Sequence, residues 1–108
     1  MNESEFNRLA DQAMVDIEEA IEASGADIDY DTISEILTLE FENGSKIIIN
    51  KQTPLSQLWV AAQSGGFHFD FDSEKQTWYL DSDNSRDLFT CLSDYCSQQA
   101  GEPIELSA

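Results

Sequence analysis

The sequence predicts an α+β fold, a two-layer sandwich with two helices packed on one face of a roughly six-stranded, mainly antiparallel sheet. Three observations predict it. The first and last segments repeat apolar residues at helical spacing, the segments between them alternate with a period of two, and turn signals separate those segments. At 108 residues and 41% hydrophobic, the chain is the right size for one domain, residues 1–108, with one core.

The first element is an amphipathic helix from Glu3 to about Ala23. Ser24-Gly25 supplies its end, because glycine takes the left-handed conformation that terminates helices. Its apolar residues recur at intervals of three and four, and so form one stripe: Phe6, Leu9, Ala10, Ala13, Met14, Ile17, Ala20 and Ile21. The opposite face carries carboxylates.

About six short strands follow in a meander. Ile28 and Tyr30 alternate with acidic residues in the first, and the others are predicted at 36–41, 45–51, 57–61, 67–71 and 77–80. Asn43-Gly44 predicts a type I′ hairpin turn, because that turn needs two positive φ angles. Pro54 ends one strand and Gly65-Gly66 precedes another.

A second helix is predicted from Ser85 to Ala100, where five apolar residues recur at helical spacing. Ser85 with Asp87 provides a cap and a favourable charge at the start, and Gly101 with Pro103 closes the end. Each helix has one apolar side. The helices and the sheet therefore bury one another best when both helices share one face, which leaves the other face open to solvent.

The chain is strongly acidic, with 22 Asp and Glu against 5 Lys and Arg and a formal net charge of −17. Such a field repels nucleic-acid phosphates and anionic membranes, and it attracts cations and basic protein surfaces. Residues 1–8 do not resemble a signal peptide, and no apolar run approaches the roughly 20 residues that span a bilayer. We expect a cytoplasmic protein that binds a positively charged partner and binds neither nucleic acid nor membranes.

The carboxylates crowd into the first part of the chain, where ten of the 22 lie within residues 1–31. Along the helix they stand one turn apart, and along the first strand they alternate at about 7 Å. A bound cation would relieve their repulsion, and oxygen donors suit hard cations such as ferric iron, Ca²⁺, Mg²⁺ or Mn²⁺. The predicted metal-binding residues are Asp11, Glu18, Glu19, Glu22, Asp27, Asp29 and Asp31.

The alternative for this cluster is a solvated helix face beside a charged edge strand that blocks aggregation. Aspartate is unfavourable in strands, so its presence at every second position opposes strand propensity. This favours a functional role of the cluster over a merely solvated surface. An EF-hand loop starting at Asp27 would need Gly and Glu where the chain has Thr32 and Thr38, so we reject a calcium sensor. We expect an open site with modest affinity.

A second candidate surface lies on the sheet, where Asn50, Gln52 and Trp59 occupy neighbouring strands. Leu58 and Val60 alternate with Trp59, so their aliphatic side chains favour the core face and leave Trp59 outside. A core tryptophan is the alternative. An exposed tryptophan flanked by amides is typical of a protein interface, and we predict that these three residues bind a partner.

No enzymatic constellation accompanies these surfaces. His68 is the single histidine and lies in a strand, more typical of a strand or surface residue than of a metal ligand. No Ser/His/Asp or Cys/His group and no glycine-rich phosphate loop can be assembled. Cys91 and Cys96 lie five apart in a helix, a spacing that a disulfide would distort, so we expect reduced thiols that pack in or near the core.

Several segments together resemble the frataxin family, in particular its bacterial, CyaY-type members, over essentially the whole chain. The resemblance is carried by Asn43-Gly44-Ser45, Ile49-Asn50-Lys51-Gln52-Thr53-Pro54, Gln57-Leu58-Trp59-Val60 and Gly65-Gly66-Phe67-His68-Phe69-Asp70. The opening Ser4-Glu5-Phe6 and the closing Gln98-Gln99-Ala100-Gly101-Glu102 also match the bacterial type. In one departure, Ala23-Ser24-Gly25-Ala26 interrupts an acidic run that bacterial members often continue.

The resemblance implies weak binding of ferrous and ferric iron on an acidic ridge, and interaction with a cysteine desulfurase and an iron–sulfur scaffold protein. Carried over by position, the ridge is the metal-binding set given above, and Glu18, Glu19 and Glu22 also bind the partner. Asn50, Gln52 and Trp59 supply the sheet-face contacts.

Three hypotheses follow. The first is a monomeric, non-enzymatic regulator of iron–sulfur cluster assembly that acts as iron donor or sensor and forms oligomers only when metal drives them. The second is ferroxidase or iron-storage activity, although the Glu and Glu-x-x-His ligands of di-iron four-helix bundles are missing. The third is an acidic module that uses charge without metal.

Overall fold

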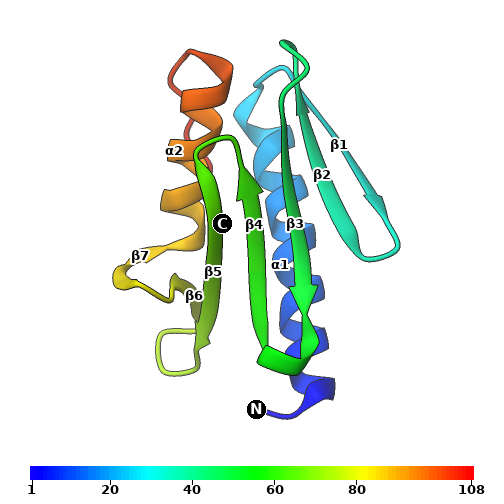
Figure 1. The fold of residues 1–108 in the computed structure, drawn as a ribbon, viewed down its shortest axis with the longest axis vertical. Coiled ribbons are helices and arrows are strands. Elements are labelled where there is room, and N and C mark those ends of the chain that lie inside the picture. Colours follow the sequence, from blue (N-terminus) through cyan, green and yellow to red (C-terminus); the bar gives the residue numbers. More distant parts are fainter.

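The computed structural model describes residues 1–108 and places two helices on one side of a seven-stranded antiparallel sheet (Figure 1). The strands adjoin one another in chain order. They are β1 (Ile28–Ile33), β2 (Ile36–Phe41), β3 (Lys46–Gln52), β4 (Gln57–Ala62), β5 (Gly65–Asp72), β6 (Thr77–Leu80) and β7 (Asp83–Asp87). The helices are α1 (Glu3–Ser24), α2 (Leu88–Ala100) and the short 3₁₀ helix η1 (Thr53–Leu55). The predicted fold class is confirmed.

Helix α1 follows the predicted apolar stripe closely. Seven of its eight stripe residues are buried, and Leu9 packs half-buried against the core. The Asn2 side chain accepts a hydrogen bond from the Glu5 N–H at 2.8 Å and caps the first turn. Gly25 ends the helix with φ 69°, the left-handed conformation that glycine adopts without strain. Neither helix is long and apolar enough to cross a membrane.

Both helices cover the same face of the sheet. Phe6 of α1 meets Trp78 of β6 edge to face, with 6.0 Å between the ring centroids. Phe67 of β5 stacks on Tyr95 of α2 at 4.4 Å. Leu58 of β4 points the same way and is fully buried. One cluster of 23 buried residues joins the two layers, and the opposite sheet face is left open.

The end of the sheet differs from the prediction. A seventh strand, β7, pairs with β6 through Tyr79 with Asp87 and Leu80 with Asp83, and its register shifts between them. The sequence predicts helix from Ser85, but α2 begins at Leu88, and its cap is Asp87, whose carboxylate accepts the Thr90 N–H at 2.8 Å. The segment is polar throughout, so its extended conformation comes from pairing with β6 rather than from any apolar period.

The type I′ turn lies elsewhere than predicted. At Asn43-Gly44 only the glycine has a positive φ, 85°, so a type I′ turn there is wrong. The Asn43 side chain instead accepts the Ser45 N–H and donates to the Gln99 carbonyl, which fixes another turn geometry. Two successive positive φ angles, 52° and 68°, occur at Ser34-Glu35 between β1 and β2, although neither residue is a glycine or an asparagine.

Candidate functional site

Strand β1 divides the predicted acidic surface in two. Asp29 and Asp31 pair across to Glu40 and Thr38 and point to the open face of the sheet, whereas Tyr30 between them opposes the buried Leu39. From the sequence, we expect the helix carboxylates and the strand aspartates to belong to one acidic ridge. Because successive side chains of a strand point to opposite faces, the helix carboxylates lie on one side of β1 and these aspartates on the other.

On the helix side, two predicted residues are tied to β1 by hydroxyl groups. The Thr32 hydroxyl donates to Glu18 at 2.7 Å, and the Tyr30 phenol donates to Glu22 at 2.8 Å. The hydrogen bond to Glu22, then desolvation and the neighbouring carboxylates, raise the pKa of Tyr30, so it remains a neutral donor. Glu19 is exposed, and no hydrogen bond or ion pair engages its carboxylate.

Asp11 stands apart from these carboxylates because a lysine already neutralises it. Lys51 Nζ lies 2.9 Å from Asp11 Oδ1 and 3.0 Å from Glu35 Oε1, and the Lys51 side chain is only 5% exposed. Burial by itself lowers the pKa of Lys51, but the hydrogen bonds to Asp11 and Glu35 outweigh it and the pKa is raised. Of the predicted metal-binding residues, Asp11 is therefore the one with a compensated charge.

On the open side of β1, carboxylates surround a shallow cavity of about 310 Å³. Its lining comes from β1, β2 and the start of β3: Asp29, Tyr30, Asp31, Thr38, Glu40 and Lys46. Lys46 lies 3.7 Å from Glu40 and is half exposed, so this surface pair compensates one of the three carboxylates only loosely. The two aspartates keep their charge exposed to solvent.

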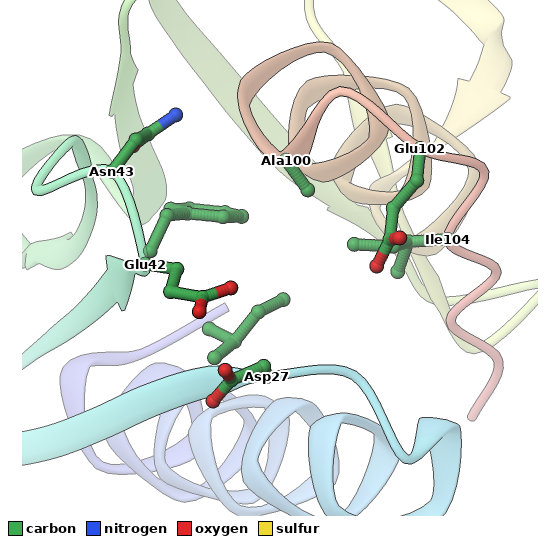
Figure 2. Close-up of a pocket in the computed structure, with 8 residues that line it drawn as sticks. Asp27, Glu42, Asn43, Ala100, Glu102 and Ile104 are labelled. Atoms are coloured by element: carbon green, nitrogen blue, oxygen red, sulfur yellow. The ribbon is translucent and has the colours of Figure 1, made fainter.

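Asp27 lies one residue before β1 and belongs to a different surface of the protein. It lines a cavity of about 460 Å³ between the β2–β3 turn and the end of α2. Figure 2 shows the carboxylates of Asp27 and Glu42 on one side of this cavity and that of Glu102 across from them. Asp27 therefore does not continue the row of Asp29 and Asp31 as part of the strand, contrary to our prediction.

The chemistry of these donors fits a hard cation, but the arrangement is open. All the predicted ligands offer carboxylate oxygens, which ferric iron, Ca²⁺ and Mg²⁺ prefer. No three Asp, Glu, His or Cys side chains converge in a geometry that could hold a metal ion. A cation would therefore be held by carboxylates on a surface rather than in a preformed cage.

A row of polar and aromatic side chains crosses the open face over three strands. Asn50 of β3 pairs with Trp59 of β4, which pairs with His68 of β5. Trp59 and His68 stack at 4.3 Å with an interplanar angle of 13°. As predicted, Leu58 and Val60 are buried and Trp59 lies outside the core.

The neighbouring row holds Trp59 in place. Trp59 Nε1 donates to Gln57 Oε1 at 3.0 Å, and Gln57 Nε2 donates to Asp70 Oδ1 at 3.0 Å. Gln52 pairs with Gln57 in this second row. Asn50 Oδ1 is buried and has no hydrogen-bond partner within the chain.

Sequence reasoning missed the apolar part of this face. Ile33, Ile36 and Ile48 are 65%, 41% and 38% exposed. Ile33 and Ile36 adjoin the row through the pairs Ile33–Ile36 and Ile36–Asn50, and Ile48 lies two residues before Asn50 on β3. The exposure of Ile36 was not predicted because it depends on the two-residue turn at Ser34-Glu35. That turn sets the register of β2 against β1. The alternation of Ile28 and Tyr30 with aspartates could have assigned those aspartates to the open face.

The two cysteines belong to the core. Both are buried and unpaired. Desolvation raises the pKa of Cys91, and desolvation raises that of Cys96 to about 12. Both thiols are therefore protonated at neutral pH and inert as nucleophiles or metal ligands.

Taken together, the fold and these surfaces define a small acidic α/β sandwich whose distinctive groups lie on one sheet edge and one open sheet face. The frataxin-like domain family matches residues 1–102. The chain belongs to this family.

Relatives and a solved structure match nearly the whole chain. "Iron-sulfur cluster assembly protein CyaY" of Paraburkholderia phymatum is 43% identical over 108 residues, 99% of each chain. The protein of the same name from Vibrio parahaemolyticus is 46% identical over 105 residues, 97% of this chain and 98% of the relative. A solved structure of frataxin from Psychromonas ingrahamii superposes with a TM-score of 0.89 at 44% identity and covers 100% of both chains.

Proposed function

We propose that this protein regulates iron–sulfur cluster assembly by binding iron weakly and by contacting a cysteine desulfurase and the cluster scaffold protein. The relatives named for iron–sulfur cluster assembly support the process. The observation that carries the proposal is the crowding of carboxylates around β1, with Glu18 and Glu22 on one side and Asp29 and Asp31 on the other. Iron is cargo or signal here, and the protein is no enzyme in this proposal.

The carboxylates around β1 serve both tasks in this proposal. Glu18, Glu19, Glu22, Asp29 and Asp31 attract ferrous or ferric iron and also a basic surface of the desulfurase. Asp27 lies close in sequence but belongs to the neighbouring cavity, and Lys51 compensates the charge of Asp11. We therefore expect Asp27 and Asp11 to contribute less to the binding of iron and of the desulfurase.

The open sheet face supplies the second contact. Asn50, Gln52 and Trp59 lie in two adjacent rows, with exposed isoleucines beside them. An anchored aromatic side chain within a polar and apolar surround is typical of protein interfaces. A cytoplasmic location belongs to the same proposal, because two unpaired thiols suit a reducing compartment.

The test is to measure desulfurase affinity and desulfurase-driven cluster formation on the scaffold across ferrous iron concentrations at constant ionic strength. Because binding free energies are reciprocally linked, iron should change desulfurase affinity if one surface serves both. The variant Glu18→Gln with Glu22→Gln keeps the hydrogen-bond acceptors and should weaken both iron binding and desulfurase binding. Glu74→Gln with Glu105→Gln removes the same charge elsewhere and should have little effect.

Paramagnetic broadening of amide signals locates the iron. Selective loss around residues 18–31 supports the proposal, whereas uniform or absent loss would favour an acidic module that uses charge alone. Desulfurase affinity that is unchanged by iron would contradict a shared surface. Cluster formation that is unaffected by the protein at every iron concentration would overturn the regulatory role.

A further inference from the structure

The outer edge of β1 is an open sheet edge. β1 pairs with β2 only, and no other element lies beyond it (Figure 1). All its residues from Asp31 to Ile33 are exposed. An edge strand carries backbone N–H and C=O groups without partners, and extended peptides bind such edges by adding a strand.

We propose that this edge binds an extended basic segment of a partner protein as an added strand of the sheet. The inference deepens the proposed function, because it assigns a binding mode to the acidic surface on which that function rests. Main-chain pairing with β1 would supply the hydrogen bonds. The charges that flank β1 would supply the selectivity.

The flanking charges specify the sequence of the partner segment. Side chains of an added strand alternate between the two faces of the sheet. One set would lie beside Asp29 and Asp31 on the open face, where the cavity of about 310 Å³ leaves room for long side chains. The other set would lie on the helix side, where Tyr30 and Glu22 meet at 2.8 Å and Thr32 and Glu18 at 2.7 Å. Since both faces are acidic, the segment should carry consecutive Lys and Arg residues rather than basic residues at alternate positions.

The hairpin end of the edge is different. Ile33 and Ile36 are 65% and 41% exposed there, and Glu35 between them is paired with Lys51. The basic run of the segment should therefore be followed by an apolar residue where it passes the β1–β2 turn.

A second copy of this chain does not fit the edge. Pairing β1 with β1 of another molecule would bring aspartates and glutamates of both copies together, in a protein of net charge −17. Charged residues on an edge strand suppress such self-association, while leaving the backbone accessible to a segment of opposite charge.

The experiment uses the full chain and a synthetic peptide with consecutive Lys and Arg residues between valines. Two further peptides carry the same sequence with N-methyl groups either on every other residue, which leaves one edge free, or on every residue, which blocks the backbone donors along both edges; the charge is unchanged. If the peptide adds to β1, the half-methylated peptide should bind like the parent through its free edge, and the fully methylated peptide roughly tenfold more weakly or worse, because about two hydrogen bonds are lost. Alternate amides of β1 should gain protection from hydrogen exchange.

Equal binding of all three peptides, or protection that misses β1, would overturn strand addition and show attraction by charge alone. Asp29→Asn with Asp31→Asn should weaken the parent peptide more than Glu74→Gln with Glu105→Gln, which removes the same charge from exposed positions elsewhere. If strand addition fails these tests, iron-induced broadening at residues 18–31 would still be observed. Failure of the proposed function would instead remove the iron response and leave the difference between the methylated peptides intact.

Discussion

Lys51 and Asp11 form an ion pair with 2.9 Å between Nζ and Oδ1, although they are 40 positions apart in the chain. Lys51 also lies 3.0 Å from Glu35 at the β1–β2 turn. One nearly buried ammonium therefore joins α1, β3 and the hairpin that carries the acidic edge.

Lys51→Met should lower the free energy of unfolding by about 1 kcal/mol, because both carboxylate partners are mostly exposed and water can solvate them. The pKa of Lys51 is raised in the folded state, so its contribution is fully present below the ordinary pKa of 10.5 and is lost as pH rises through the raised value. Urea unfolding of both proteins should show a difference that shrinks above that pH. Lys46→Met, at an exposed pair, is the control, and a difference that does not depend on pH would contradict the ion pair.

Gln99 should be a stability determinant although it is polar. It is 5% exposed, accepts the Gln63 N–H at 3.0 Å and donates to Ser45 Oγ and the Lys46 carbonyl. Gln99→Leu leaves those groups without partners and should cost about 1–3 kcal/mol in urea unfolding. Gln98→Leu, at the exposed neighbouring position, should change stability by less than about 0.5 kcal/mol. Similar effects of the two variants would refute the network.

The two tryptophans should separate binding from stability. Trp78 is 6% exposed and contacts Phe6 and Phe71, so Trp78→Ala should destabilise the fold by about 3–5 kcal/mol. Trp59 lies half-buried on the open face, so Trp59→Ala should cost far less stability yet weaken partner binding by about 2 kcal/mol or more. Thermal unfolding and affinity for the scaffold and desulfurase complex check this. Unchanged affinity for a folded Trp59→Ala protein would remove this face from the interface.

The thiols should be protected in the native protein. Because burial holds Cys91 and Cys96 protonated, a thiolate-directed reagent at pH 8 should label them only at the rate of unfolding. Their stabilising contribution is present below the ordinary pKa of 9.0 and is lost as pH rises towards about 12 at Cys96, because the unfolded chain ionises first. Mass spectrometry follows the labelling. Prompt labelling of the native protein would contradict the burial of the two thiols.

Parts of the candidate site could be predicted because they depend on local alternation. The outward position of Trp59 follows from its aliphatic neighbours Leu58 and Val60, and the structure confirms it. The division of the acidic surface was missed, because it depends on which face of β1 meets α1. The position of the type I′ turn was missed because Ser34-Glu35 adopts left-handed angles that its composition does not favour.

By itself, the sequence determined the helix at each end, the antiparallel meander between them, the acidic character and the family resemblance. These properties follow from periods of 3.6 and 2 and from composition, which are local in the chain. Only the tertiary structure decided that Lys51 compensates Asp11, that Tyr30 and Thr32 hold Glu22 and Glu18, and that carboxylates flank both sides of an open edge. Such contacts join residues far apart in sequence, so they form only when the sheet and helix pack together.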